Sequence, residues 1–271
     1  MPDIAALIQT EAERLIADAQ GGEPPILFLS GPQGSGKTTL AKTLLDQVAG
    51  SVCLSLDDFY LSKAERQGLA EQIHPLFETR GPPGTHHVEQ LINTISDLQR
   101  VTPERPIALP VFDKRTDDVV PRSDWRQVEQ RPSIILLEGW LLGVTADPNA
   151  PWSDPINEIE ALDAEGIWRG YQEAMLATNY ADLWSLADRF IYLETDDFAN
   201  IYQWRAQQEE QTLGLRPGSL AKDRHDWLKR FIAHYERLTR RLLAGQRHPG
   251  HAIKIDVQRE VIASSLSYHK L

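Results

Sequence analysis

Short apolar runs recur along the chain, and most are followed by longer stretches in which apolar side chains return at helical spacing. Short runs bounded by turn residues are typical of buried strands, and the longer stretches are typical of amphipathic helices. The pattern predicts strands at residues 26–30, 51–56, 134–137, 190–193 and 252–255. Another run, at 107–112, contains Pro110 and is expected at a sheet edge or in an extended loop.

The longer stretches predict helices at residues 3–19, 37–50, 62–71, 86–98, 156–176, 198–213 and 220–243. Thr85 is expected to cap the helix that begins at residue 86. The charged segment 113–125 is predicted to be a mobile excursion, and the proline-rich segment 147–154 a loop.

Strands that alternate with helices favour a mainly parallel sheet covered on both faces. The predicted fold is therefore a three-layer α/β/α sandwich of the P-loop type with a helical lid. We expect one domain over residues 1–271, with an insertion at about 60–125 and the lid at about 203–220.

The P-loop assignment depends on residues 31–38, which read GPQGSGKT and fit the pattern G-x-x-x-x-G-K-[ST] between a predicted strand and a predicted helix. Its glycines allow successive N–H groups to point at anionic oxygens. We expect Lys37 to reach the β- and γ-phosphates of ATP and the Thr38 hydroxyl to hold Mg²⁺. The predicted nucleotide-binding residues are Gly31, Gln33, Gly34, Ser35, Gly36, Lys37, Thr38 and Thr39. The alternative is a glycine-rich turn before an ordinary helix.

Acidic residues follow two of the predicted strands. Asp57 and Asp58 follow the strand at 51–56, which we expect beside the P-loop strand. A carboxylate there is well placed to orient and deprotonate an acceptor hydroxyl, so Asp57 is the predicted base and Asp58 a further contact to substrate or to Mg²⁺-bound water. Glu138, after the strand at 134–137, is the predicted second anchor for Mg²⁺. The alternatives are helix-capping aspartates and an ordinary strand-end acid.

Arginines near the lid are candidates for stabilising the transferring phosphoryl group. Arg205 is the predicted catalytic one, and Arg216 is a second candidate; for either, the alternative is a solvated helix face. His86 and His87 are adjacent and lack a clear third ligand, so we do not predict a zinc site. Trp140, next to Glu138, is the tryptophan that we expect to wall a substrate site.

Composition limits the function. The formal net charge is −11, so no basic field attracts nucleic acid, and no stretch is long and apolar enough to predict a membrane span. Cys53 is the single cysteine, which excludes a disulfide within the chain and suits a reducing compartment. With no signal-like start, the sequence predicts a cytoplasmic enzyme that acts on a small molecule, and no protein partner is evident.

Five elements occur in an order that resembles a known family: the P-loop, SLDDFY at 55–60, GTH at 84–86, LPVFDK at 109–114 and LEGW at 137–140. Together they are similar to the D-glycerate 3-kinase group within the uridine kinase, phosphoribulokinase and pantothenate kinase superfamily. The segments around 203–205 and 216–218 are similar too. The resemblance implies an ATP-dependent kinase that converts D-glycerate to 3-phospho-D-glycerate with Mg²⁺.

The resemblance also implies roles. The base falls on Asp57 and the acid that assists Mg²⁺ on Glu138. Contacts to the acceptor fall on His86, Asp113 and Lys114, and Tyr60 is a further candidate for substrate binding. The glycerate carboxylate needs a cation, for which Lys114 and Arg80 are the candidates. The chain departs from the family at His87, where plant-type enzymes carry Asp, and at 115–118, which reads RTDD rather than a glycine-containing, more basic run.

Two other interpretations stay open. One is a kinase for another small alcohol, such as a nucleoside or pantothenate. The other is a P-loop regulatory protein that binds ATP without an acceptor; such a protein needs no dedicated base, whereas a kinase should lose orders of magnitude in turnover on Asp57→Asn.

Overall fold

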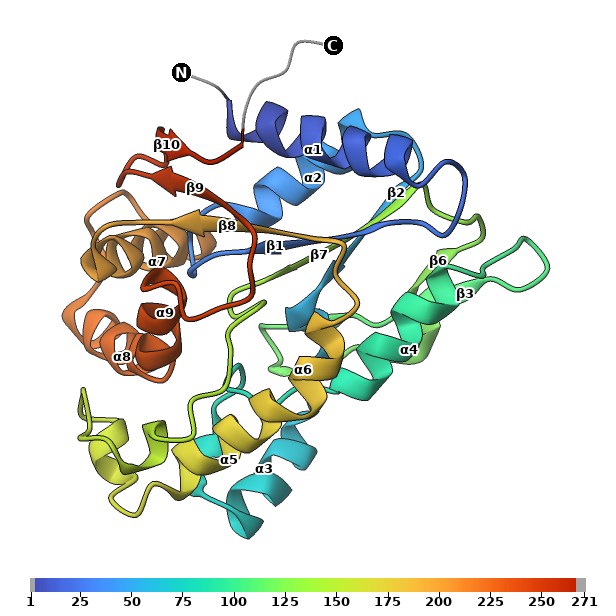
Figure 1. The fold of residues 1–271 in the computed structure, drawn as a ribbon. Helices are drawn as coiled ribbons and strands as arrows, with labels where there is room; N and C mark the ends of the chain where they lie inside the picture. The colour runs from blue at the N-terminus through green and yellow to red at the C-terminus, as the bar shows by residue number, and fades with distance from the viewer. Residues whose placement is uncertain (1–2, 267–271) are drawn as a thin grey trace.

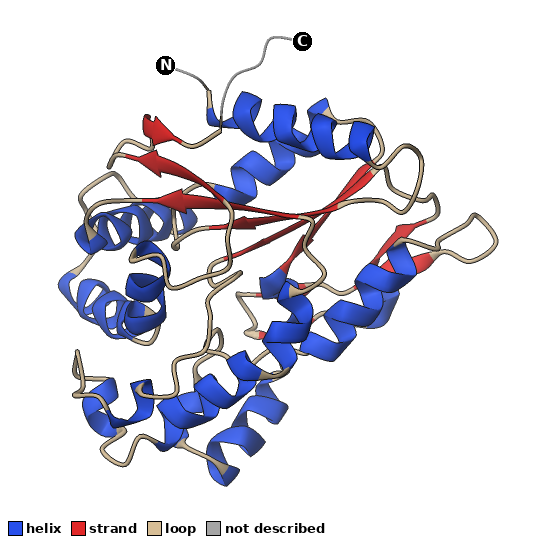
Figure 2. Cartoon of the chain, viewed as in Figure 1, coloured by secondary structure: helices blue, strands red, loops and turns tan. Residues whose placement is uncertain are grey.

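The computed structural model of the protein describes residues 3–266. Its centre is a six-stranded sheet in the order β10-β9-β8-β1-β7-β2, with helices on both faces (Figures 1 and 2). The strands are β1 (Ile26–Ser30), β2 (Ser51–Ser55), β7 (Ile134–Gly139), β8 (Arg189–Glu194), β9 (His251–Ile255) and β10 (Val261–Ser264). All pairings are parallel except β9 with β10. The predicted α/β fold with a mainly parallel sheet is confirmed.

The two layers of helices bury opposite faces of the strands. Leu27 and Leu29 pack with α1 (Ile4–Asp18) and α2 (Lys37–Gln47), which lie above the sheet in Figure 1. Phe28, between them, faces the other cluster. The helices of that second layer are α4 (Val88–Leu98), α6 (Asn179–Trp184) and α9 (Glu236–Leu243). Both faces are apolar, which is why these strands read as continuous apolar runs.

The remaining elements are further helices, short strand pairs and single turns of 3-10 helix. The helices are α3 (Lys63–Gln72), α5 (Ile167–Ala177), α7 (Phe198–Thr212) and α8 (Lys222–Ala233). Two short antiparallel pairs, β3 (Ile107–Leu109) with β6 (Arg126–Val128) and β4 (Phe112–Asp113) with β5 (Asp118–Val119), lie in the segment between α4 and β7. Single turns of 3-10 helix occur at Leu56–Phe59, Pro75–Glu78, Arg122–Asp124, Ala150–Trp152 and Glu160–Leu162.

Two predicted helices are wrong in extent. The helix predicted at 156–176 begins only at Ile167, because the Asp163 carboxylate accepts the N–H groups of Trp168 and Arg169 at 2.9 and 3.0 Å and so caps the first turn. The helix predicted at 220–243 breaks into α8 and α9 at Tyr235, whose hydroxyl donates to the carbonyl of Arg80 at 2.6 Å.

Two local predictions are also wrong. Thr85 caps no helix: its hydroxyl accepts the N–H of Gly81 and donates to the carbonyl of Pro82, both at 2.8 Å, and α4 begins at Val88. The strand that carries Asp57 is not beside β1, because β7 lies between them. The excursion at 113–125 contains β5, and within it the Trp125 indole donates to the carbonyl of Val120; its mobility stays a prediction. The short elements α6 and β10 were not predicted.

Within residues 3–266, no helix combines the length and the apolar character that a bilayer crossing requires.

Candidate active site

The P-loop connects β1 to α2 at the carboxyl edge of the sheet. Gly34 and Gly36 have φ angles of +77° and +97°, which other L-residues rarely adopt. A Cβ on Gly34 would lie 2.6 Å from the Cβ of Trp204, because α7 crosses the loop at close range. The glycines therefore allow the loop to curve, and Gly34 also allows α7 to pack against it.

Lys37, Thr38 and Glu138 meet where the P-loop faces β7. The buried Lys37 ammonium donates to the carbonyl of Pro32 at 3.0 Å, and burial lowers its pKa. The hydroxyls of Thr38 and Ser55 both donate to Glu138 Oε1 at 3.0 Å. Glu138 reaches this place because β7 pairs directly with β1. A hydroxyl beside a carboxylate is a donor set of the kind Mg²⁺ takes, so these residues fit the predicted cation.

Asp57 lies in the turn after β2 and is held from two sides. Its two carboxylate oxygens accept from the Tyr60 hydroxyl and the Lys114 ammonium, each at 2.6 Å. Burial raises its pKa, but the Lys114 charge and the hydrogen bonds from Lys114 and Tyr60 outweigh burial, so the pKa lies well below its ordinary value. Asp57 is therefore ionised at neutral pH and has a fixed direction.

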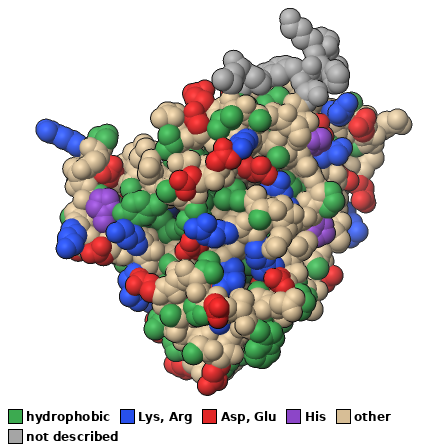
Figure 3. All heavy atoms as spheres, turned by 60° about the vertical axis from the view of Figure 1, so that its left-hand side comes forward, with side chains coloured by type: hydrophobic (Ala, Val, Ile, Leu, Met, Phe, Trp, Pro, Cys, Tyr) green, Lys and Arg blue, Asp and Glu red, His purple; other side chains and the backbone are tan. Residues whose placement is uncertain are grey.

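One cavity of about 540 Å³ joins the P-loop to these groups. Its polar and charged lining outside the P-loop includes Asp57, Tyr60, Arg80, Lys114, Glu138, Arg205 and Arg259. Figure 3 turns the α7–α8 side of the molecule toward the reader, and basic side chains gather near the middle of this face with acidic ones among them. The cavity thus brings the predicted phosphate-binding residues and most of the predicted acceptor residues together.

Arg205 lies on α7, within the segment at about 203–220 that was predicted as the lid. Its guanidinium donates to Gln208 at 2.7 Å and lies 5.5 Å from the centroid of the Phe231 ring on α8. Its Nε has no hydrogen-bond partner among the described residues. Arg216 is exposed in the turn after α7 and does not line the cavity.

Besides Arg216 and Gly31, which do not line the cavity, Asp58, Asp113 and His86 also lie outside it. Asp58 accepts the N–H of Phe112 at 3.2 Å, and burial raises its pKa to about 6. Asp113 accepts the N–H of Arg115 at 2.9 Å. His86 is buried against Tyr180, whose hydroxyl lies 2.6 Å from His86 Nδ1, and burial lowers the pKa of His86 to about 3.

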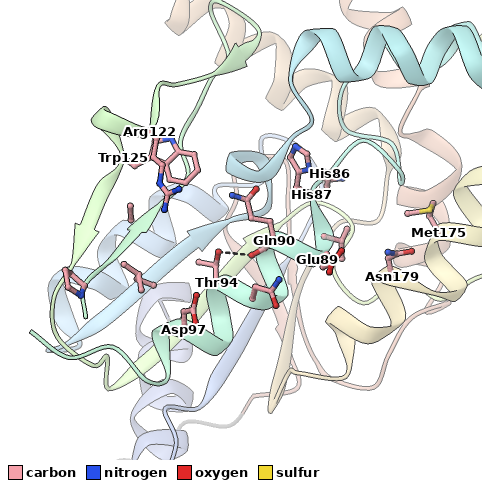
Figure 4. Close-up of a pocket in the computed structure, with 15 residues that line it drawn as sticks. His86, His87, Glu89, Gln90, Thr94, Asp97, Arg122, Trp125, Met175 and Asn179 are labelled. Atoms are coloured by element: carbon pink, nitrogen blue, oxygen red, sulfur yellow. Dashed lines mark hydrogen bonds between the residues drawn. The ribbon is translucent and has the colours of Figure 1, made fainter. Parts of the chain in front are cut away.

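His86 instead lines a second cavity of about 790 Å³, between α4 and the β3–β6 pair (Figure 4). This cavity is the larger of the two, but it contains no P-loop residue. Its labelled lining combines side chains of α4, among them Gln90, Thr94 and Asp97, with side chains from other segments such as Trp125 and Met175. Size alone therefore does not mark the candidate site, because the phosphate-binding loop and the ionised carboxylate share the smaller cavity.

Ser55 and Arg259 belong to the candidate site but were not predicted from the sequence. Ser55 could have been predicted from the sequence, because it immediately precedes the turn that carries Asp57. Arg259 carried no signal: it follows β9 at a φ of +68°, and its Nε donates to the carbonyl of Gly34 at 2.7 Å. This contact depends on where the β9–β10 turn lies in the fold.

Comparison with known proteins gives the following. No protein-family model matches this chain. The chain is 31% identical over 204 residues to the uncharacterized kinase mug58 of Schizosaccharomyces pombe, a match that covers 69% of this chain and 71% of that protein. It is 28% identical over 264 residues to the chloroplastic D-glycerate 3-kinase of Arabidopsis thaliana, covering 90% of this chain and 54% of that protein, so it spans about half of the plant protein's length.

A solved structure of D-glycerate 3-kinase from Cryptococcus neoformans is similar over nearly the whole chain. The TM-score is 0.76 at 21% identity, and the match covers 98% of this chain and 99% of that one. At this level of identity the likeness concerns the fold, and it confirms the P-loop kinase architecture that the sequence pattern predicted.

Proposed function

Because this chain belongs to the glycerate kinase family of P-loop kinases, we propose that it transfers the γ-phosphoryl group of ATP to D-glycerate. That it is an ATP-dependent kinase follows from its relatives. The acceptor and the residue roles are our proposal. The observation that carries it is the shared cavity, in which an ionised, doubly held Asp57 faces the same space as the P-loop.

At the nucleotide end, the P-loop amides and Lys37 would bind the phosphates. Thr38 and Glu138 would hold Mg²⁺, which when bound neutralises charge on the β- and γ-phosphates. Ser55 donates to Glu138 and so orients its carboxylate.

At the acceptor end, Asp57 would accept a hydrogen bond from the terminal hydroxyl of glycerate and aim its oxygen at the γ-phosphorus. The low pKa of Asp57 makes it a weak base, so it receives the proton as the new O–P bond forms and the oxygen becomes acidic. Lys114 and Tyr60 keep the carboxylate ionised and in position until then. The product is 3-phospho-D-glycerate.

Arg205 would neutralise the equatorial oxygens of the transferring group. We propose that α7 and the turn after it, at about 203–220, act as a lid that brings Arg205 closer when ATP is bound. The segment at about 60–125 supplies Tyr60, Arg80 and Lys114, so we propose it as the acceptor-binding insertion of a single kinase domain. A cytoplasmic location is part of the proposal, supported by the single cysteine, which suits a reducing compartment.

The cationic side chains Arg80 and Lys114 favour an anionic acceptor over a nucleoside. The test is ATP consumption by the purified full chain with D-glycerate, L-glycerate, uridine and pantothenate, with the product identified by ³¹P NMR. We expect turnover with D-glycerate and 3-phosphoglycerate as product, and none with uridine. Turnover with D-glycerate no faster than the rate in its absence would overturn the proposal, and an ATPase rate unaffected by Asp57→Asn would favour a regulatory P-loop protein.

A further inference from the structure

One aspartate of the charged excursion, Asp117, sits between two arginines at the acceptor end. Its side chain accepts from Arg66 Nη2 at 2.5 Å and forms an ion pair with Arg80. Asp117 has a φ of +58°, an unfavourable angle for most residues and one that Asp and Asn tolerate best. The two guanidinium groups lie 5.8 and 5.7 Å from the centroid of the same ring, that of Phe112.

Arg66 anchors this cluster. Its side chain is 1% exposed and donates to the carbonyls of Leu61, Glu78 and Asp117 at 2.8, 3.2 and 3.2 Å. The guanidinium donors of Arg66 are therefore bound to acceptors inside the protein, and the position of Arg66 fixes that of Asp117.

Arg80 differs from Arg66 in what it leaves open. It lines the cavity, and Asp117 engages only its Nη1. Among the described residues, nothing accepts a hydrogen bond from Nε or Nη2 of Arg80. An Nε–Nη2 edge is the planar pair of donors that binds a carboxylate through both oxygens.

The charges at this end are nearly balanced. The charges of Lys114 and Asp57 neutralise each other, so Lys114 leaves no net positive charge for the acceptor. Two arginines against one Asp117 leave a single positive charge. Neither Asp117 nor Asp118 lines the cavity itself, but Asp117 pairs with Arg80, which does line it. The Asp118 carboxylate instead accepts the backbone N–H groups of Lys63 and Val119 at 3.1 and 2.9 Å.

We propose that Arg80 binds the carboxylate of the acceptor and that Asp117 limits the acceptor to one negative charge. This inference rests on the proposed function for the identity of the acceptor, and it assigns the carboxylate to Arg80 rather than Lys114. A second carboxylate bound next to Arg80 would lie close to the Asp117 charge that Arg80 pairs with, and the Arg66–Asp117–Arg80 cluster has no further positive charge to offset it, so the site discriminates by repulsion as well as by attraction.

Three alcohols that differ in charge test this. Glycerol is neutral, D-glycerate carries one carboxylate, and hydroxymethylmalonate is glycerate with its 2-hydroxyl replaced by a second carboxylate. Binding of each to the full chain saturated with a non-hydrolysable ATP analogue and Mg²⁺ is measured by calorimetry. The wild-type protein should bind D-glycerate at least about tenfold more tightly than either of the others.

Asp117→Asn keeps the tolerated backbone angle and removes the charge. It should raise the affinity for hydroxymethylmalonate relative to D-glycerate by about tenfold. Asp124→Asn lies in the same excursion, but Asp124 is exposed and its carboxylate accepts from the Ser123 hydroxyl rather than from Arg80, so this change should leave the ratio unchanged. Should Asp117→Asn not fold, Arg80→Gln decides: it should abolish the preference for D-glycerate over glycerol while the affinity for the ATP analogue stays as in the wild type.

The inference is overturned if Asp117→Asn leaves the affinity ratio unchanged, if Arg80→Gln binds D-glycerate normally, or if the wild-type protein binds none of the three alcohols. Turnover with D-glycerate is followed in parallel. Absent turnover with the predicted binding ratios overturns the proposed function and supports the inference, whereas normal turnover with unchanged ratios overturns the inference alone.

Discussion

Replacing Gly34 by Ala should damage ATP binding more than folding of the rest of the chain. The φ of +77° costs an alanine about 1–2 kcal/mol. The added Cβ would lie 2.6 Å from Trp204 Cβ and 2.9 Å from its backbone carbon, and overpacking of this kind costs about 1–3 kcal/mol. The total of about 2–5 kcal/mol appears as loss of stability, or as loss of ATP affinity where the loop shifts to relieve the contact.

Calorimetric titration with a non-hydrolysable ATP analogue and a thermal melt separate these two routes. A shifted loop should weaken binding by about 30-fold or more, since each 1.4 kcal/mol is a factor of ten. Gly68→Ala is the matched control, because nothing lies within 4 Å of its Cβ and the site is inside α3, where alanine should add about 0.5–1 kcal/mol of stability. Unchanged affinity and unchanged melting temperature for Gly34→Ala would refute the reasoning.

The contact geometry permits a second check. The atoms nearest to the new methyl group are the Cβ and the backbone of Trp204 and the amide nitrogen of Arg205, not the indole ring. Trimming the ring by Trp204→Ala should therefore not restore ATP binding to the Gly34→Ala protein. Restored affinity in the double variant would show that the indole, rather than the backbone of α7, is what the loop cannot avoid.

Three further changes have defined outcomes. Asp57→Asn should lower kcat with D-glycerate by about 10²–10⁴-fold while ATP affinity stays within about threefold; a rate near wild type contradicts the assigned base. Lys114→Met removes the cation that holds the pKa of Asp57 down, so the acid limb of the kcat/KM profile should move to higher pH; an unmoved limb contradicts this coupling. Burial lowers the pKa of His86 to about 3, so the unfolded chain, at about 6.5, binds a proton first as pH falls. The His86 contribution to stability should fall by about 2 kcal/mol between pH 7 and 5, measured in denaturant titrations as the difference between the wild-type and His86→Gln slopes, since the raised pKa of Asp58 acts in the opposite direction in both proteins. Equal slopes for the two proteins contradict that origin.

Local sequence was sufficient wherever a feature is contained in consecutive residues. The P-loop could be predicted because glycine spacing, lysine and hydroxyl all lie within residues 31–38. The strand order could not be predicted, because the sequence of a helical crossover does not indicate which strand the next one pairs with. In the structure β7 lies between β1 and β2. That insertion changes the chemistry, because it puts Glu138, rather than Asp57, directly beside the P-loop strand.

The predicted helix ends are wrong where a side chain, rather than a backbone carbonyl, accepts the N–H groups at the end of the helix. Residues 156–176 have the apolar spacing of one helix, yet the Asp163 carboxylate takes the first N–H groups of α5 and starts the helix eleven residues late. The break between α8 and α9 has a tertiary cause as well, since Tyr235 turns there to reach the Arg80 carbonyl. The Asp163 carboxylate is local, five and six residues before the N–H groups that it accepts, whereas the Arg80 carbonyl lies 155 residues from Tyr235 and gives no signal near the second helix end.

The acceptor end shows how a loop that looks mobile in sequence becomes part of a site. Residues 113–125 are charged and contain no apolar period, which is why the pattern favours an excursion. The buried guanidinium of Arg66 holds this segment in place, because it donates to both the carbonyl and the carboxylate of Asp117. A buried guanidinium without such acceptors would be unfavourable. Once Asp117 is fixed, it orients Arg80, and Lys114 from the same segment reaches Asp57. The segment that departs most from the family pattern therefore contacts both the proposed base and the proposed carboxylate partner, so differences among relatives at 115–118 should change acceptor choice before they change phosphoryl transfer.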